Sequence, residues 1–136
     1  MTPFSLKIVT PDGLAYEGQA EEVTVRSTTG DIGILAGHLN CVAPLGMGRA
    51  TIVIDGQKRY AACIGGMLSV VNGAVTLVPT TFEWAEDIDP DRADRAAERA
   101  KALLSDKTAK SADIAVAEAK LKRALIRKNV ADTKTR

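Results

Sequence analysis

The chain has 136 residues, of which 46% are hydrophobic but only 4% aromatic, and its formal net charge is +1. This length suits one domain with an appendage, and the scarcity of rings means that the core must be built from Val, Ile, Leu and Ala. No apolar run approaches the 18 residues of a membrane-spanning helix, so no membrane span is expected.

The first part of the chain is predicted to form short strands separated by turns. Residues 4–9 alternate apolar and polar side chains, and Pro11-Asp12-Gly13 forms a turn because Pro presets φ and Gly accepts a positive φ. Further strands or buried segments are expected over 14–17, 20–28, 32–35 and 42–45, with a turn at 29–31 and a loop at 37–40.

Two β-hairpins are predicted from Asp55-Gly56 and Asn72-Gly73. These dipeptides suit type I′ turns, whose twist matches that of the flanking strands. The turns join 50–54 to 58–64 and 67–71 to 74–78. Gly65-Gly66 indicates a bulge or a close backbone approach. Strands of this length and spacing predict an antiparallel β-sandwich or flattened barrel.

The composition changes near residue 87. Residues 87–136 contain one Pro, no aromatic residue and many Ala, Arg, Lys and Asp residues. We therefore predict an α+β fold in which residues 1–86 form the β-sandwich and residues 87–136 form a separate helical arm. An arm with so little apolar bulk needs a docking surface.

The arm is predicted to be an antiparallel two-helix hairpin. Asp89 suits a helix N-cap and Pro90 the first helical position, and a second helix starts near Ser111. The apolar positions recur at helical spacing: Ala93, Ala96, Ala97, Ala100, Leu103 and Leu104, then Ile114, Ala117, Leu121, Ala124 and Leu125. Because this seam is mostly Ala, the hairpin should be marginally stable and able to detach or unfold. Residues 131–136 are expected to fray.

The sequence offers no catalytic or metal-binding pattern. Cys41, Cys63 and His38 are too few for the four ligands of a structural zinc site, and no nucleophile–base pair or phosphate-binding loop is present. We expect two buried, reduced thiols in a cytosolic protein, with a disulfide between them as the alternative. The chain is therefore predicted to be non-catalytic and to hold no metal.

The arm carries most of the positive charge. Residues 1–86 have five basic and eight acidic residues, whereas residues 112–136 have seven basic and three acidic residues. Arg92 and Arg99 share one helix face, as do Arg123 and Arg127. In a folded hairpin the four guanidinium groups could converge on a polyanion, since Arg binds phosphate in a bidentate manner. The alternative is ordinary surface charge.

Three motifs then resemble one family. Gly30-Asp31-Ile32-Gly33-Ile34-Leu35-Ala36-Gly37-His38 resembles the GD-x-GI-x-x-GH signature of the epsilon subunit of bacterial F-type ATP synthases. Ile64-Gly65-Gly66-Met67-Leu68-Ser69-Val70 is similar to that family's Gly-Gly strand. Ala85-Glu86-Asp87-Ile88-Asp89 with Arg92-Ala93 is similar to the start of its C-terminal hairpin. The resemblance covers essentially the whole chain.

The resemblance implies a rotor subunit of a proton- or sodium-translocating synthase. Its β-sandwich would sit on the central stalk against the gamma subunit and the c-ring. Its hairpin would lie folded, or extend into the alpha/beta catalytic head and inhibit ATP hydrolysis. The protein would be peripheral to the cytoplasmic face of the bacterial inner membrane and held there only through the complex.

The resemblance also implies site residues. Some family members bind ATP as a regulatory ligand in the folded hairpin, and the matching positions here are Glu83, Ile88, Asp89, Arg92, Ala93, Arg99, Arg123 and Arg127. The stalk and ring interface would include Asp31, Gly37 and His38. Contacts to the acidic loop of the catalytic head are expected from Lys120, Lys122, Arg123, Arg127 and Lys128. The chain departs from many relatives at 39–44, after Gly37-His38, and the helix junction at 105–110 is variable.

Two other classes of function stay open. One is a free-standing nucleotide-binding sensor without a stalk role. The other is nucleic-acid binding by the basic helix, which is disfavoured because no aromatic residue of the arm could stack on bases and the β module is acidic.

Overall fold

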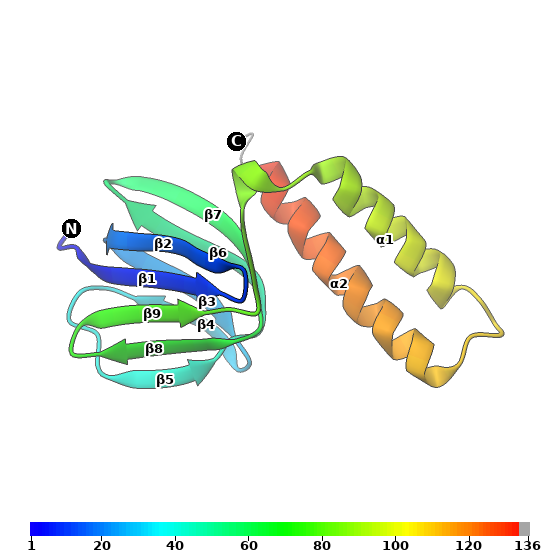
Figure 1. Cartoon of the computed structure of the whole chain (residues 1–136), viewed down its shortest axis with the longest axis horizontal. Helices are drawn as coiled ribbons and strands as arrows, with labels where there is room; N and C mark the ends of the chain where they lie inside the picture. The colour runs from blue at the N-terminus through cyan, green and yellow to red at the C-terminus, as the bar shows by residue number, and fades with distance from the viewer. Residues whose placement is uncertain (134–136) are drawn as a thin grey trace. The chain divides into compact units, whose positions relative to one another are not determined.

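The computed structural model describes residues 1–133, which divide into two compact units, Met1–Trp84 and a second unit that begins at Ala85. The first unit consists of ten strands and the second of a short 3-10 helix and two α-helices (Figure 1). The α+β class, with the strands first and the helices last, is confirmed.

The first unit is a sandwich of two five-stranded sheets. The first sheet has the order β2-β1-β9-β8-β5 and the second β10-β7-β6-β3-β4. The pairings are antiparallel except that β1 runs parallel to β9. The strands are β1 (Phe4–Thr10), β2 (Gly13–Ala20), β3 (Glu22–Ser27), β4 (Gly30–Ile34), β5 (Cys41–Pro44), β6 (Met47–Ile54), β7 (Gln57–Ile64), β8 (Met67–Val71), β9 (Ala74–Val78) and β10 (Thr81–Trp84).

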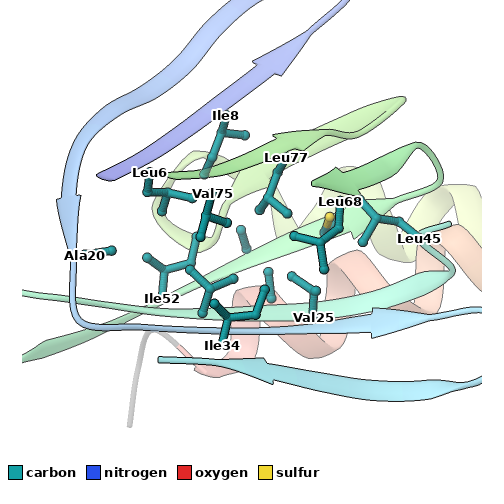
Figure 2. Close-up of a cluster of buried hydrophobic side chains, with 14 of the residues drawn as sticks. Leu6, Ile8, Ala20, Val25, Ile34, Leu45, Ile52, Leu68, Val75 and Leu77 are labelled. Atoms are coloured by element: carbon teal, nitrogen blue, oxygen red, sulfur yellow. The ribbon is translucent and has the colours of Figure 1, made fainter. Parts of the chain in front are cut away.

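Aliphatic side chains from both sheets fill the space between them. Figure 2 shows Leu6, Leu68 and Leu77 of the first sheet pointing toward Ile34 and Ile52 of the second. All five are fully buried, with an exposed fraction of 0%. The predicted Val, Ile, Leu and Ala core is therefore confirmed, and this unit has an apolar centre of its own.

The two predicted hairpin turns are confirmed. Asp55 and Asn72 have φ values of 52° and 49°, and the glycine that follows each also has positive φ. This is the backbone of a type I′ turn, and residues other than Gly, Asn and Asp adopt it at a cost. Each turn fixes the register of its strand pair, β6–β7 and β8–β9.

Gly65-Gly66 lies between strands rather than inside one. The chain crosses here from β7 of the second sheet to β8 of the first. Gly66 has a φ of +94°, and a Cβ atom on it would lie 2.0 Å from the Val78 carbonyl oxygen. The predicted close backbone approach is confirmed, and no larger residue fits there without moving the neighbouring backbone.

Four local predictions need correction. The strand expected over 14–17 continues over β2 to Ala20 because it pairs along the whole of β1. Gly30 and Asp31, expected in a turn, begin β4, and Leu35, expected to be buried, is 54% exposed. Both cysteines are free thiols, but Cys41 is only half-buried because it lies on the edge strand β5. Burial raises the pKa of Cys63 to about 12.

The second unit is an antiparallel helical hairpin (Figure 1). The 3-10 helix η1 (Ala85–Asp87) precedes α1 (Pro90–Leu104), and a short connection leads to α2 (Ser111–Thr133). In that connection Asp106 accepts hydrogen bonds from the backbone N–H and the hydroxyl of Thr108 at 2.9 and 2.7 Å, which lower the pKa of Asp106. The two predicted helices and their starting points are confirmed.

The predicted apolar stripe is only partly right. The alanines at 93, 97, 100, 117 and 124 are buried, but Leu103 and Leu125 are 39% and 43% exposed. The helix seam is therefore poorer in large side chains than the sequence pattern indicated. The expected fraying from Ala131 is wrong over 131–133, since α2 continues to Thr133 and Ala131 is buried. Residues 134–136 lie outside the described residues. No helix within residues 1–133 has the length and hydropathy needed to cross a bilayer.

Gly66→Ala is expected to lower the free energy of unfolding of the sandwich by at least about 3 kcal/mol, because the new methyl group meets backbone atoms that cannot rotate away. Gly73→Ala is the matched control: φ is +82°, but nothing lies within 4 Å of the new Cβ, so only the strain of about 1–2 kcal/mol applies. Urea unfolding followed by the fluorescence of Trp84, the single tryptophan, measures both. Equal losses would contradict the close approach.

Candidate functional site

A cavity of about 450 Å³ lies between the two helices of the hairpin. Such a volume falls in the range of small-molecule sites. Five of its lining residues are apolar and four are basic. The apolar ones are Ala96, Ala100, Leu103, Ala117 and Ala124, and the basic ones are Arg99, Lys120, Arg123 and Arg127.

Helical spacing explains how the cavity is built. The lining residues of each helix follow one another at intervals of one or three positions, so they share the face that meets the other helix. Because four of the five apolar side chains on this face are those of alanine, they fill little of the space between the helices. Long cationic side chains then surround a floor of methyl groups.

All the charged residues that line this cavity, called here the hairpin cavity, are basic. No acidic side chain lines it among the described residues. Within residues 1–133, Arg99, Lys120 and Arg123 take part in no ion pair, whereas Arg127 has a polar or electrostatic interaction. Cations gathered without counter-charge repel one another, and a bound polyanion would remove that repulsion. The hairpin cavity is therefore suited to phosphates.

One ion pair joins the two helices beside the cavity. Lys128 Nζ on α2 lies 2.8 Å from Asp94 Oδ1 on α1, and this hydrogen bond raises the pKa of Lys128. Both side chains are about half exposed, so the pair contributes little to stability, but it shows which turns of the helices face each other. Lys128 is thus engaged within the folded hairpin.

The residues at the start of α1 have a different setting. The Asp89 carboxylate accepts hydrogen bonds from the backbone N–H groups of Asp91 and Arg92 at 3.0 and 3.2 Å, so its predicted N-cap role is confirmed. Ile88 and Ala93 are buried, while Arg92 is exposed. None of these residues lines the hairpin cavity.

The predicted ATP-binding residues are therefore brought together only in part. Arg99, Arg123 and Arg127 line one cavity, and none of the predicted residues at the start of α1 is among its lining residues. Glu83 belongs to β10 of the first unit, where it is half-buried. Of the residues expected to contact the catalytic head, Arg123, Arg127 and Lys120 line the cavity, Lys122 is exposed, and Lys128 is paired with Asp94.

The predicted stalk-interface residues lie around β4. Asp31 is exposed and its Oδ1 lies 2.7 Å from Arg26 Nε. Gly37 has a φ of +83°, and the ring nitrogen Nδ1 of His38 lies 2.7 Å from the Leu39 carbonyl oxygen. Because Asp31 is near the start of β4 and His38 follows its end, about 10 Å of strand separates them.

A further surface was not predicted from the sequence. The outer face of β5, β8 and β9 carries four large exposed apolar side chains, and these three strands contain no charged residue. These side chains are Val42, Met67, Val71 and Val78, with exposed fractions between 43% and 67%. We call them the apolar face. The signal that could have revealed this face is the absence of charged residues from all three strands, because a strand side that faces water usually carries some charge.

Two family models match the chain. Residues 3–85 match the beta-sandwich domain of the ATP synthase delta/epsilon chain, and residues 86–132 match its long alpha-helix domain. Together they define the class: a β-sandwich joined to a helical arm, as in the delta/epsilon chains.

Similar sequences show to which of these two kinds of chain the protein is related. The ATP synthase epsilon chain of Bacillus velezensis is 44% identical over 131 residues, covering 96% of this chain and 98% of the relative. That of Caldanaerobacter subterraneus is 43% identical, covering 94% and 93%. The chain therefore belongs to the epsilon-chain family of ATP synthases.

Solved structures share the fold. One chain of the Euglena gracilis mitochondrial ATP synthase, in a cryo-EM structure of OSCP, F1 and the c-ring, matches with a TM-score of 0.81 and 22% identity, covering 100% of this chain and 83% of that one. A chain of the Tetrahymena thermophila mitochondrial ATP synthase, from a structure of the central stalk and c-ring, matches with a TM-score of 0.65 and 11% identity, covering 93% and 95%. At these identities the likeness concerns the fold alone.

The cap of α1 can be separated from a ligand role of Asp89. Asp89→Ala removes the acceptor of two N–H groups and is expected to lower the stability of the hairpin by about 1 kcal/mol, whereas Asp89→Ser keeps a capping oxygen and should lose only a few tenths. Asp91→Ala removes a neighbouring charge without removing the cap. Helical circular dichroism during thermal unfolding measures all three. A loss by Asp89→Ser equal to that of Asp89→Ala would contradict this account.

Proposed function

We propose that the chain is a non-catalytic rotor subunit of a proton- or sodium-translocating F-type ATP synthase. The observation that carries this proposal is the match of both units, in order, to the two domains of the delta/epsilon chain. The partners are the gamma subunit, the c-ring and the alpha/beta catalytic head. The protein would work at the cytoplasmic face of the bacterial plasma membrane as a peripheral component, attached through the complex.

The sandwich provides the attachment to the stalk. Its core is fully buried, so it can transmit force as a rigid body, whereas the apolar face leaves Val42, Met67 and Val71 in water. Exposed apolar surface without charge is the composition of a protein interface. We assign this face to the gamma subunit, and Asp31, Gly37 and His38 to the contacts with the stalk and ring.

The hairpin provides regulation. A buried Ala contributes one methyl group, or about 0.8 kcal/mol, where a buried Leu contributes about 1.5–3 kcal/mol. A seam made of Ala93, Ala97 and Ala100 against Ala117 and Ala124 therefore holds the folded hairpin weakly. A folded and an extended arm of similar free energy form a switch. In the extended state the basic face of α2, including Lys120, Lys122, Arg123, Arg127 and Lys128, would reach an acidic loop of the catalytic head and brake hydrolysis.

ATP is the proposed regulatory ligand of the folded arm. Three of the Arg residues implied by the family motif line the hairpin cavity, and that cavity exists only while α1 and α2 are paired. A ligand that binds one state alone shifts the equilibrium toward it by linkage. Abundant ATP would thus keep the arm folded and prevent it from inhibiting hydrolysis.

A free-standing nucleotide sensor is the second candidate function. The hairpin cavity suits it equally well. The apolar face favours the rotor, because an unattached sensor gains nothing from a charge-free surface of exposed Val and Met residues.

Calorimetric titration of the full chain with ATP is expected to show saturable binding. Arg99→Ala should weaken it about tenfold or more, since a hydrogen bond to a charged group is worth about 1.5–3 kcal/mol. Arg95→Ala is the matched control, because Arg95 is exposed on the same helix and does not line the cavity. Arg92→Ala tests whether the start of α1 also contacts the ligand. Equal affinities for Arg99→Ala and Arg95→Ala would place any ATP site elsewhere.

Removal of the arm tests the brake. A chain ending after residue 86 retains the whole sandwich core and should still assemble with the stalk. The reconstituted ATPase carrying it is expected to hydrolyse ATP several-fold faster than the enzyme with the full chain at low ATP, because nothing can extend into the catalytic head. Unchanged hydrolysis with normal assembly would contradict a regulatory arm and leave the stalk role in place.

A further inference from the structure

Among the four basic side chains that line the hairpin cavity, Lys120 is the one that the family's nucleotide motif does not include. It stands on α2 three residues before Arg123 and seven before Arg127, so the three cations form a row along one helix face. The row spans about 10 Å of helix axis. Lys120 is its end nearest the connection between the helices, because α2 starts at Ser111.

The charges at the two ends of the hairpin differ. Around the start of α1 the chain carries Glu86, Asp87, Asp89 and Asp91 within six residues. Such a cluster repels phosphates, whereas carboxylates accept hydrogen bonds from hydroxyl and amino groups. A nucleotide would therefore place its sugar and base toward the start of α1. Its phosphate chain would point along the cationic row toward Lys120.

We propose that Lys120 binds the terminal phosphate of the nucleotide and so determines the preference for a triphosphate over a diphosphate. The inference rests on the proposed nucleotide site of the hairpin. The guanidinium groups of Arg99, Arg123 and Arg127 supply paired donors to the inner phosphates. The Lys120 ammonium is a compact charge with three donors, and it has no ion-pair partner among residues 1–133.

Lys122 provides a control within the same helix. It has the same charge and chemical type as Lys120 and lies two residues away, but it is exposed and does not line the cavity. Because residues two apart on a helix point in different directions, the two substitutions change the net charge equally and the cavity unequally. General electrostatic attraction would make the two variants alike.

The test compares ATP and ADP affinities of the full chain by calorimetry. Lys120→Ala should lower the affinity for ATP about tenfold and the affinity for ADP less than about threefold. The preference for ATP over ADP should therefore fall. Lys122→Ala should change neither by more than about twofold, and Lys120→Arg should restore most of the ATP affinity. Circular dichroism should show equal helicity for all variants, since Lys, Arg and Ala are good helix formers.

The outcomes separate this inference from the proposal beneath it. ATP binding that Lys120→Ala and Lys122→Ala weaken equally, or an equal loss of ATP and ADP affinity in Lys120→Ala, would overturn the role of Lys120 and leave the nucleotide site standing. Absence of ATP binding by the unsubstituted chain would overturn the nucleotide site and Lys120 together. The stalk assignment of the sandwich would be unaffected.

Discussion

The contact between α1 and α2 depends on methyl groups. Alanine at 93, 97, 100, 117 and 124 is buried in the hairpin, and Leu103 is the only large apolar side chain among the described residues that line the cavity. This one constraint has two consequences. The seam is weak, because each residue removes little apolar surface from water. It is also hollow, and the hollow is surrounded by cations. A hairpin packed with leucines would be more stable and would have no such cavity.

The sandwich, unlike the hairpin, has a core of large aliphatic side chains. Leu, Ile and Val side chains from both sheets meet in one buried layer (Figure 2), and backbone turns at Asp55, Asn72 and Gly66 fix how the strands pair and cross. Packing of this kind resists deformation. A rigid sandwich and a weakly held hairpin are the two parts that the proposed stalk subunit would need, one for attachment and one for a change of state.

Different contacts, observed and proposed, would use the same basic side chains of α2. Arg123 and Arg127 line the hairpin cavity, and the same side chains are among those proposed to contact the catalytic head. Lys128 is already paired with Asp94 across the hairpin. Folding of the arm, the proposed phosphate binding and the proposed contact with an acidic partner would therefore use one set of charges. Each process that uses them withholds them from the others, which is the reciprocity that linkage demands.

Local signals in the sequence determined much of this protein. Asp55-Gly56 and Asn72-Gly73 specify their turns, Asp89-Pro90 starts α1, and the loss of Gly and aromatic residues separates the arm from the sandwich, because each depends on neighbours along the chain. Only the tertiary structure decided that β1 runs parallel to β9 and that Lys120 faces the cavity while Lys122 does not. Those outcomes depend on pairing between segments far apart and on the register that the connection at 105–110 imposes on two helices. Periodicity alone carries no information about which turn of α1 meets which turn of α2.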